Sequence, residues 1–212
     1  MLPGHSPAPD AAMFPFGKQR LRLTMSGAIA AAVLGLAMPL SGIIFSNFDI
    51  AAWIFAVLWF LALGGSAVFL AWVGWADRHM YLAFDATGVW WRHKEKGKKK
   101  GHVVIPWASL EAAGLFWCHE GPNNSGHTLV SLELCPRDGV DEHDPALSPL
   151  IVHDQPDLPG VADRRYRIGI PVFATRHYGN QLVEAARSRT ADLWFGEHER
   201  PTGYIQVADL IS

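Results

Sequence analysis

Two long apolar runs separated by a turn of four residues constrain this chain more than any other feature. From residue 25 to residue 76 the only Asp, Glu, Lys or Arg is Asp49. At 1.5 Å per residue, a helix over 25–45 is about 31 Å long, which matches the hydrocarbon core of a bilayer. A second helix over 50–75 is longer still. We therefore predict a two-helix transmembrane hairpin within residues 23–76.

Two other interpretations of these runs fit less well. A buried core hairpin of a soluble protein rarely contains adjacent uncharged runs of about 20 residues each. A cleaved signal peptide has an apolar region of only about 7–15 residues, whereas the first run is longer and is not followed by a convincing cleavage site. No ionisable residue lies deep in either run, as it usually does in transporters and proton relays. The hairpin is expected to be a retained anchor.

The charges around the two spans predict their orientation. Lys18, Arg20 and Arg22 precede the first span, Arg78 follows the second, and the connecting turn contains only Asp49. The positive-inside rule then predicts a multi-pass protein of the cell (inner or plasma) membrane with both termini in the cytoplasm. Residues 1–22 are expected to be a cytoplasmic N-terminal tail.

From residue 80 the pattern changes to short strand-like runs separated by turns, which predicts a second domain over 80–196. Loops rich in Pro, Asp and Gly at 136–149 and 153–164 are expected to be long and exposed. Apolar residues at three- and four-residue steps predict a helix over 175–195, and 197–212 is expected to be a tail. The predicted strands cover 81–84, 89–91, 102–107, 115–119, 129–134, 150–152 and 166–172.

One part of this domain resembles a known family. The run YLAFDATGVW from Tyr81 to Trp90, followed by IPWASL from Ile105 to Leu110, is similar to the opening of bacterial pleckstrin-homology-like (PH-like) domains. There, an Asp-x-x-Gly turn leads, two strands later, to an Ile-x-Trp entry into a short turn. Many members also have two N-terminal membrane spans. The resemblance implies a curled antiparallel sheet of about seven strands with one C-terminal helix. The predicted fold class is thus a membrane α-helical hairpin plus an α+β domain.

The residues of this motif also have physical roles that do not depend on the family. Asp85 is suited to begin a turn, and Gly88 is expected to supply a positive φ after it. Pro106 has no N–H for a strand ladder, so it suits a strand end. Trp107 offers a large apolar surface to a small core.

A basic segment follows the second span at a short distance. Such a cluster is attracted to anionic headgroups by about 1 kcal/mol per basic residue near the surface. The alternative is a solvated hairpin tip that also enforces topology. Nucleic-acid binding is not expected, because the cluster is single and lacks interleaved aromatic residues. The candidate lipid-binding residues are Arg92, Lys94, Lys96, Lys98, Lys99 and Lys100.

Catalytic and metal-binding signatures are weak throughout. No catalytic motif, metal-type spacing or cofactor motif is present, and Cys118 and Cys135 give no disulfide or metal pattern. We therefore expect a non-enzymatic, membrane-anchored interaction or scaffolding protein that binds lipid headgroups, a protein partner or its own copy. The alternative is a membrane-tethered metal-dependent hydrolase using acidic and histidine residues in loops. The loop residues are Glu142, His143, Asp144, His153 and Asp154, and two further histidines, His119 and His127, are candidates to lie across a hairpin from each other.

Overall fold

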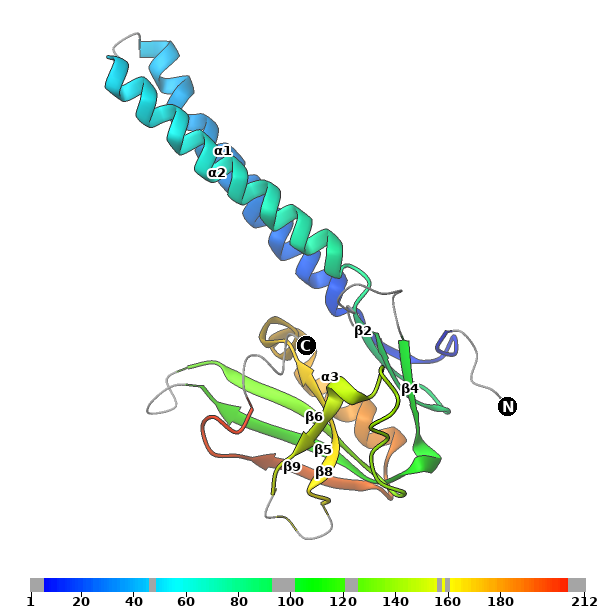
Figure 1. The fold of residues 1–212 in the computed structure, drawn as a ribbon. Helices are drawn as coiled ribbons and strands as arrows, with labels where there is room; N and C mark the ends of the chain where they lie inside the picture. The colour runs from blue at the N-terminus through cyan, green and yellow to red at the C-terminus, as the bar shows by residue number, and fades with distance from the viewer. Residues whose placement is uncertain are drawn as a thin grey trace. The chain divides into compact units, whose positions relative to one another are not determined.

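The chain forms two compact units. The computed structural model describes residues 6–45, 49–92, 102–120, 126–155, 158 and 161–205. One unit is Gly17–His79, and the other joins Met1–Phe16 to Met80–Ser212 (Figure 1).

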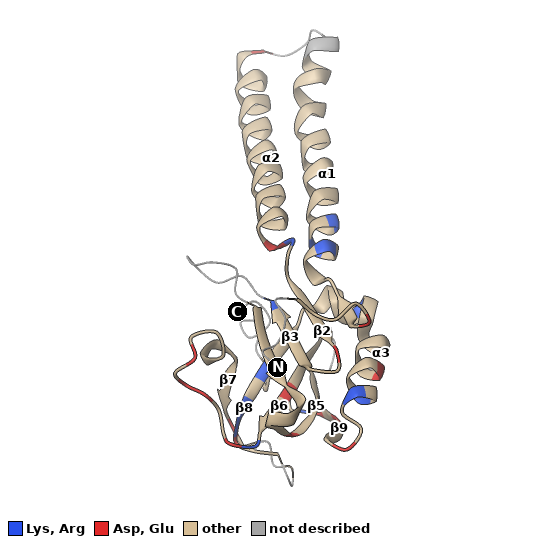
Figure 2. Cartoon of the chain, turned by 90° about the vertical axis from the view of Figure 1, so that its right-hand side faces the viewer, with Lys and Arg blue, Asp and Glu red and all other residues tan. Residues whose placement is uncertain are grey.

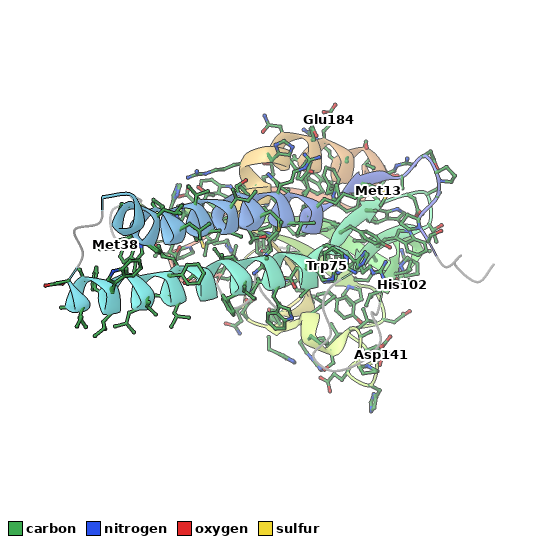
Figure 3. All side chains as sticks on the ribbon, turned by 90° about the horizontal axis from the view of Figure 1, so that it is seen from above. Met13, Met38, Trp75, His102, Asp141 and Glu184 are labelled. Carbon is green, nitrogen blue, oxygen red and sulfur yellow. The ribbon has the colours of Figure 1, made fainter. Side chains whose placement is uncertain are left out.

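The first unit is a hairpin of two antiparallel helices, α1 (Phe16–Phe45) and α2 (Ile50–Asp77), which lie side by side (Figure 3). Asp49 caps α2, since its Oδ1 accepts the Ala52 N–H at 2.8 Å. Both helices are long and apolar enough to cross a membrane. The two predicted helices are confirmed, but α1 begins at Phe16 rather than near residue 25. The basic residues before the apolar run are good helix formers and extend the helix.

Small residues bring the two helices into close contact. A Cβ added at Gly74 would lie 1.9 Å from Thr24 Oγ1, and one at Gly35 would lie 3.2 Å from Leu63 Cβ. The Trp59 indole N–H donates to the Leu34 carbonyl at 3.2 Å. Leu34 precedes Pro39, the proline inside α1, by a little over one helical turn. Trp59, in the middle of α2, is therefore used to pair the helices.

The second unit contains nine strands in its described residues, arranged in two sheets. The four-stranded sheet has the order β1-β2-β3-β4, and all its pairs are antiparallel. Its strands are β1 (Ala12–Phe14), β2 (Tyr81–Phe84), β3 (Gly88–Arg92) and β4 (His102–Pro106). The five-stranded sheet has the order β7-β8-β6-β5-β9. Its strands are β5 (Leu110–His119), β6 (Thr128–Pro136), β7 (Ile151–His153), β8 (Arg164–Ile170) and β9 (Trp194–Glu199).

Short 3₁₀ turns and one helix complete this unit. The turn η1 (Trp107–Ser109) joins β4 to β5, and η3 (Ser148–Leu150) precedes β7. Helix α3 (Val172–Arg189) follows β8. It ends at Thr190, whose hydroxyl donates to the Ala186 carbonyl at 2.8 Å. The predicted α+β class is confirmed.

The structure corrects several sequence-based details of this domain. The strands form two sheets rather than one, and β9 runs parallel to β5, so the expected all-antiparallel arrangement is wrong there. The helix was predicted to extend to 195, but Leu193 follows α3 and Phe195 lies in β9. Apolar residues spaced for a helix can equally face a core from a turn and a strand, so periodicity alone misplaced this end.

Strand β1 changes the expected role of the N-terminal tail. Ala12 pairs with Phe84 and Phe14 pairs with Leu82, so β1 is an edge strand of the four-stranded sheet. The chain leaves the sheet after β1, passes through α1 and α2, and returns to the same sheet as β2. The hairpin is thus an insertion between two strands that are hydrogen-bonded to each other.

The main core lies between the two sheets and α3. Alternate residues of each strand point inward, as a half-buried sheet requires. The apolar stripe of α3 lies against both sheets through Leu182 and Ala186. Burial of these side chains is the main stabilising term of the unit. Fully buried members include Leu82, Phe84, Val89, Leu115, Leu132, Leu134 and Ile168.

Candidate functional site

The basic segment is only partly described by the structure. Arg92 is the last residue of β3, where it pairs with Tyr81 on one side and His102 on the other. It is half-buried. The remaining candidate lipid-binding residues, Lys94, Lys96, Lys98, Lys99 and Lys100, lie outside the described residues. Their contact with headgroups therefore stays a prediction.

The residues Asp85, Gly88 and Trp107, which belong to the motif similar to PH-like domains, have structural roles. Asp85 Oδ1 accepts the backbone N–H groups of Thr87 at 2.7 Å and Gly88 at 3.1 Å. The Trp107 indole N–H donates to the Asp85 carbonyl at 2.7 Å, which ties the β2–β3 turn to η1. Burial raises the pKa of Asp85, but hydrogen bonds to the carboxylate, including one from the Ala8 N–H, hold this pKa below its ordinary value.

Gly88 is needed for a reason other than the expected one. Among the described glycines, positive φ values occur at Gly139, Gly196 and Gly203. A Cβ at Gly88 would instead lie 2.2 Å from the carbonyl oxygen of Ile105, its neighbour on β4. The close approach of two strands explains this glycine.

The described acidic and histidine residues of the loops do not converge on a metal site. Among the described residues, no group of three or more His, Cys, Asp and Glu is arranged to hold a metal ion. Asp141 Oδ1 accepts the His143 N–H at 2.9 Å, and Glu142 forms an ion pair with Arg164. Asp144 Oδ1 accepts the Ala146 N–H at 2.8 Å. The contacts of Asp141 and Asp144 lie within the 136–149 loop, and the Glu142–Arg164 pair joins this loop to β8.

A buried ionic network, which the sequence analysis did not anticipate, lies on the other face of the five-stranded sheet. Glu133 on β6 and Arg165 on β8 are both fully buried, and Arg167 is 6% exposed. Glu133 Oε2 accepts from Arg165 Nε at 2.7 Å, and its Oε1 accepts from Arg167 Nε at 2.6 Å. Figure 2 shows the negative charge on β6 beside the positive charges on β8. Each carboxylate oxygen of Glu133 thus has its own guanidinium.

Asp154 and Tyr204 complete the network from outside the sheet. Asp154 Oδ2 accepts from Arg167 Nη2 at 2.8 Å, and Asp154 Oδ1 forms a short contact with Arg165 Nη2. The Tyr204 hydroxyl accepts from Arg165 and donates to Asp154 at 3.1 Å. Two carboxylates therefore balance two guanidinium groups, as buried charges require. The Arg167 guanidinium also lies over the Tyr204 ring, 4.7 Å from its centroid.

The charges of this network shift the pKa of its members. Burial raises the pKa of Asp154, but Arg165 and Arg167 more than offset this and hold the pKa below its ordinary value. Burial lowers the pKa of Arg165, yet Glu133 and Asp154 raise it above the ordinary value. Burial also raises the pKa of the Tyr204 phenol. The charged forms are stabilised by one another.

The network joins segments far apart in the sequence. It ties the 154–163 loop and the segment 200–205 to the face of the sheet that carries Phe116, Cys118 and Cys135. The Arg165 guanidinium also donates to the carbonyls of Ala162 and Asp163, at 3.1 and 3.4 Å. The 153–164 loop was predicted to be exposed, yet Val161 is buried against this second cluster. Asp154 is therefore a structural residue.

One signal in the sequence points to this network. Arg165 and Arg167 alternate with Tyr166 and Ile168 in β8, and Glu133 lies between leucines. Charges at alternate positions of a strand normally mark its solvent-exposed face. Here that face is covered by the chain that follows, so the pattern indicates a polar surface without saying what covers it.

An open apolar groove lies between α3 and the ends of β5 and β6. Its volume is about 190 Å³. Gly179 lines it from α3, and a Cβ added there meets no atom within 4 Å. Its polar lining residues are Thr128, Thr175, Asn180 and, from β9, Glu197. The apolar lining comes from Leu115, Trp117, Val130, Ile170, Leu182 and Val183. Such a groove suits an aliphatic or aromatic group.

In comparisons with known proteins, no family model, curated protein or solved structure matches the chain.

Proposed function

We propose that this chain is a non-enzymatic interaction or scaffolding protein anchored by two membrane passes, with a PH-like domain that faces the cytoplasm. The observation that carries the proposal is the insertion of the apolar hairpin between β1 and β2, which pair with each other. Strands of one sheet occupy one side of a membrane, so both ends of the hairpin belong to the same compartment. An even number of passes satisfies this condition.

Loop charges support the cytoplasmic side of the inner or plasma membrane. Lys18, Arg20 and Arg22 at the start of α1 and Arg78 after α2 lie at one end of the hairpin, and Asp49 lies at the other (Figure 2). This asymmetry follows the positive-inside rule. Both termini are then cytoplasmic.

The PH-like assignment is supported by two features. The Asp85 turn and Trp107 are joined by a hydrogen bond, as expected if the motif marks one folding unit. Two sheets enclose one core that α3 contacts. Strands β1 and β9 are additions to the pattern that the resemblance implies.

Binding rather than catalysis is supported by the two conspicuous features of the domain. The buried charges are used to hold the domain together, whereas the apolar groove beside α3 is open. A protein partner, a second copy or a lipid headgroup is the expected class of ligand. The metal-dependent hydrolase alternative relies on His143 and His153, and no specific contact favours it.

Membrane topology tests the anchoring part of the proposal. Reporter fusions at the two termini and at Asn47 in the full chain should place both termini in the cytoplasm and the turn on the other side. The protein should also resist carbonate extraction. Termini on opposite sides, or release by carbonate, would contradict the proposal.

Photo-crosslinking tests the binding part. A crosslinking residue at Asn180, on the edge of the groove, should capture a discrete partner in cells, whereas one at exposed Gln181 on the same helix should not. Equal capture at both positions would count against the groove.

Two further measurements test what the domain binds. Replacing Lys98, Lys99 and Lys100 by Gln should weaken binding to anionic vesicles, and unchanged binding would remove that segment from the proposal. Stoichiometric zinc or manganese in the purified protein, lost in His143→Ala and His153→Ala, would contradict the non-enzymatic assignment.

A further inference from the structure

Three basic residues at the start of α1 have different environments. Lys18 and Arg22 are four positions apart, so they lie on the same face of the helix, one turn from each other. Arg20 lies between them in sequence and points elsewhere. Its Nη1 is 2.8 Å from Asp77 Oδ2 on α2. The sequence presents one basic cluster, and the helix divides it into two faces.

Arg20 is used within the hairpin. The side chain of Asp77 is 6% exposed and that of Arg20 is 29% exposed, so the pair is largely shielded. A Cβ at Gly17 would lie 2.1 Å from the Asp77 carbonyl oxygen, which shows how closely the helices meet at this point. The ion pair therefore closes the base of the hairpin, and the charge of Arg20 is balanced.

The positive charges of Lys18 and Arg22 have no counter-charge of this kind among the described residues. Both side chains are exposed, and neither forms an ion pair with any residue that the structure describes. Like charges four residues apart on a helix repel each other. An anion from outside the chain would relieve this repulsion.

The contacts between the helices place these two cations at a particular depth. Arg20 is opposite Asp77, and Gly74 is opposite Leu21 and Thr24. The apolar surface thus begins on α1, after Arg22, at the level where it ends on α2, before Asp77. This common boundary marks where a bilayer's hydrocarbon meets its headgroups.

Aromatic residues at this level support the same assignment. Trp72 and Trp75, in the last turns of α2, are 61% and 60% exposed, and the Arg78 guanidinium lies 3.7 Å from the centroid of the Trp75 ring. Exposed tryptophans beside cations are typical of the membrane interface. After Arg22 along α1, the exposed side chains of Leu23 and Ile29 offer an apolar surface to acyl chains. A lipid therefore fits better than a free phosphate ion.

We propose that Lys18 and Arg22 together bind the phosphate group of an anionic phospholipid in the leaflet where α1 enters the membrane. This inference rests on the proposed insertion of the hairpin, and it assigns a lipid site separate from the basic segment at 92–100. Lys18 and Arg22 donate to the phosphate oxygens, while their alkyl stems extend along the helix toward the headgroups. Arg20 takes no part, because Asp77 holds it.

The test uses the full chain, purified in detergent and titrated with phosphatidylglycerol or phosphatidylcholine, with bound lipid counted by native mass spectrometry. The wild type should bind phosphatidylglycerol preferentially. The variant K18Q/R22Q should lose this preference, with binding weakened about fivefold per cation removed. The matched variant R176Q/R187Q removes two exposed cations from α3 and should bind as the wild type does.

Two further measurements separate the possible causes of a lost preference for phosphatidylglycerol. The charge-preserving variant K18R/R22K should keep the preference, which excludes general damage to the hairpin. Inorganic phosphate at the same concentration should compete poorly, because it has no acyl chains. Retained preference in K18Q/R22Q, or equal loss in R176Q/R187Q, would overturn the site.

Failure of this inference can be told apart from failure of the proposed function. A wild-type chain that carbonate releases from membranes would overturn both. A wild-type chain that stays inserted but binds the two lipids equally would overturn only the lipid site.

Discussion

The hairpin and the domain differ in which side chains they expose and which they bury. Among the described residues, every large apolar side chain that is exposed lies in the hairpin, with the single exception of Met13. The domain buries its apolar residues and also encloses Glu133, Arg165 and Arg167. The comparison indicates two solvents: the hairpin suits a hydrocarbon environment, and the domain suits water.

Ion pairs show the same contrast. The hairpin has a largely buried pair at its base, Arg20 with Asp77, beyond the apolar surface. The domain places a network of alternating charges on the covered face of a sheet. In the domain, the Arg165 guanidinium also donates to the backbone carbonyls of Asp154 and Ala162, which compensates its burial. Hydrocarbon would offer no such acceptors, and the charges of the hairpin lie at its ends.

Removing the shared carboxylate of the network should have the largest effect. Glu133→Ala leaves the guanidinium groups of Arg165 and Arg167 buried without their main counter-charge, which should lower the free energy of unfolding by about 3–5 kcal/mol. Thermal unfolding of the full chain in detergent, followed by near-UV circular dichroism, measures this. Glu142→Ala, which breaks the exposed pair with Arg164, should cost about 0–1 kcal/mol. Similar losses in both variants would mean that the network is not stabilising.

A charge placed on the apolar surface of the hairpin tests its solvent directly. Leu61 is 60% exposed on α2 and Met13 is 50% exposed on β1. Leu61→Arg should impair insertion by about 2.5–3.5 kcal/mol, whereas Met13→Arg should change little. The fraction of protein that resists carbonate extraction reports the difference. Normal insertion of the Leu61→Arg chain would argue against a membrane-spanning hairpin.

Packing between the two helices gives a smaller effect. Gly74→Ala forces a Cβ against Thr24 and should destabilise the helix pair by about 1–3 kcal/mol. Gly64→Ala in the same helix meets no atom within 4 Å and serves as the matched control. Unfolding in mixtures of SDS and mild detergent separates the two. If Gly64→Ala is the more harmful change, the pairing of α1 with α2 described above is wrong.

Acid should weaken the network through Asp154. The pKa of Asp154 is lowered in the folded state, so its stabilising contribution is complete above the ordinary carboxyl pKa of about 4 and is lost as the pH falls through the lower folded value. Unfolding midpoints of the full chain between about pH 3 and 7 should therefore fall more steeply in the wild type than in Asp154→Asn. Parallel curves for the two proteins would contradict this assignment.

The smallest expected effect is a gain of stability in the groove. Gly179→Ala replaces a helix-interior glycine where the added Cβ has open space, so it should stabilise the domain by about 0.5–1 kcal/mol. The same thermal unfolding experiment detects it. A loss of stability would show that the groove is more tightly packed than its volume indicates.

Sequence reasoning predicted the parts of the fold that have a local signal. The two apolar helices, the strand Tyr81–Phe84 and the α+β class of the domain are confirmed. Strand β1 was missed because three residues between prolines and a helix have too short a pattern. The C-terminal part of the predicted helix was wrong because the residues from 190 to 195 keep helix-like apolar spacing in a turn and a strand.

The candidate sites were predictable to different degrees. The basic residues Lys18, Arg20 and Arg22 are visible in the sequence, but only contacts across the hairpin separate Arg20 from the other two. The alternation of Arg165 and Arg167 is visible as well. Their partner Tyr204 is distant in sequence and is brought to them by the fold. No local pattern contains that information.

The sequence by itself determined the hairpin, because more than forty nearly uncharged residues in two runs suit hydrocarbon and little else. Only the tertiary structure decided that the hairpin is inserted between two paired strands, since β1 is recognisable only by its partner β2. The tertiary structure likewise decided which charges are balanced within the chain and which remain exposed. Composition is a property of each residue alone, whereas pairing depends on distances that exist only after folding.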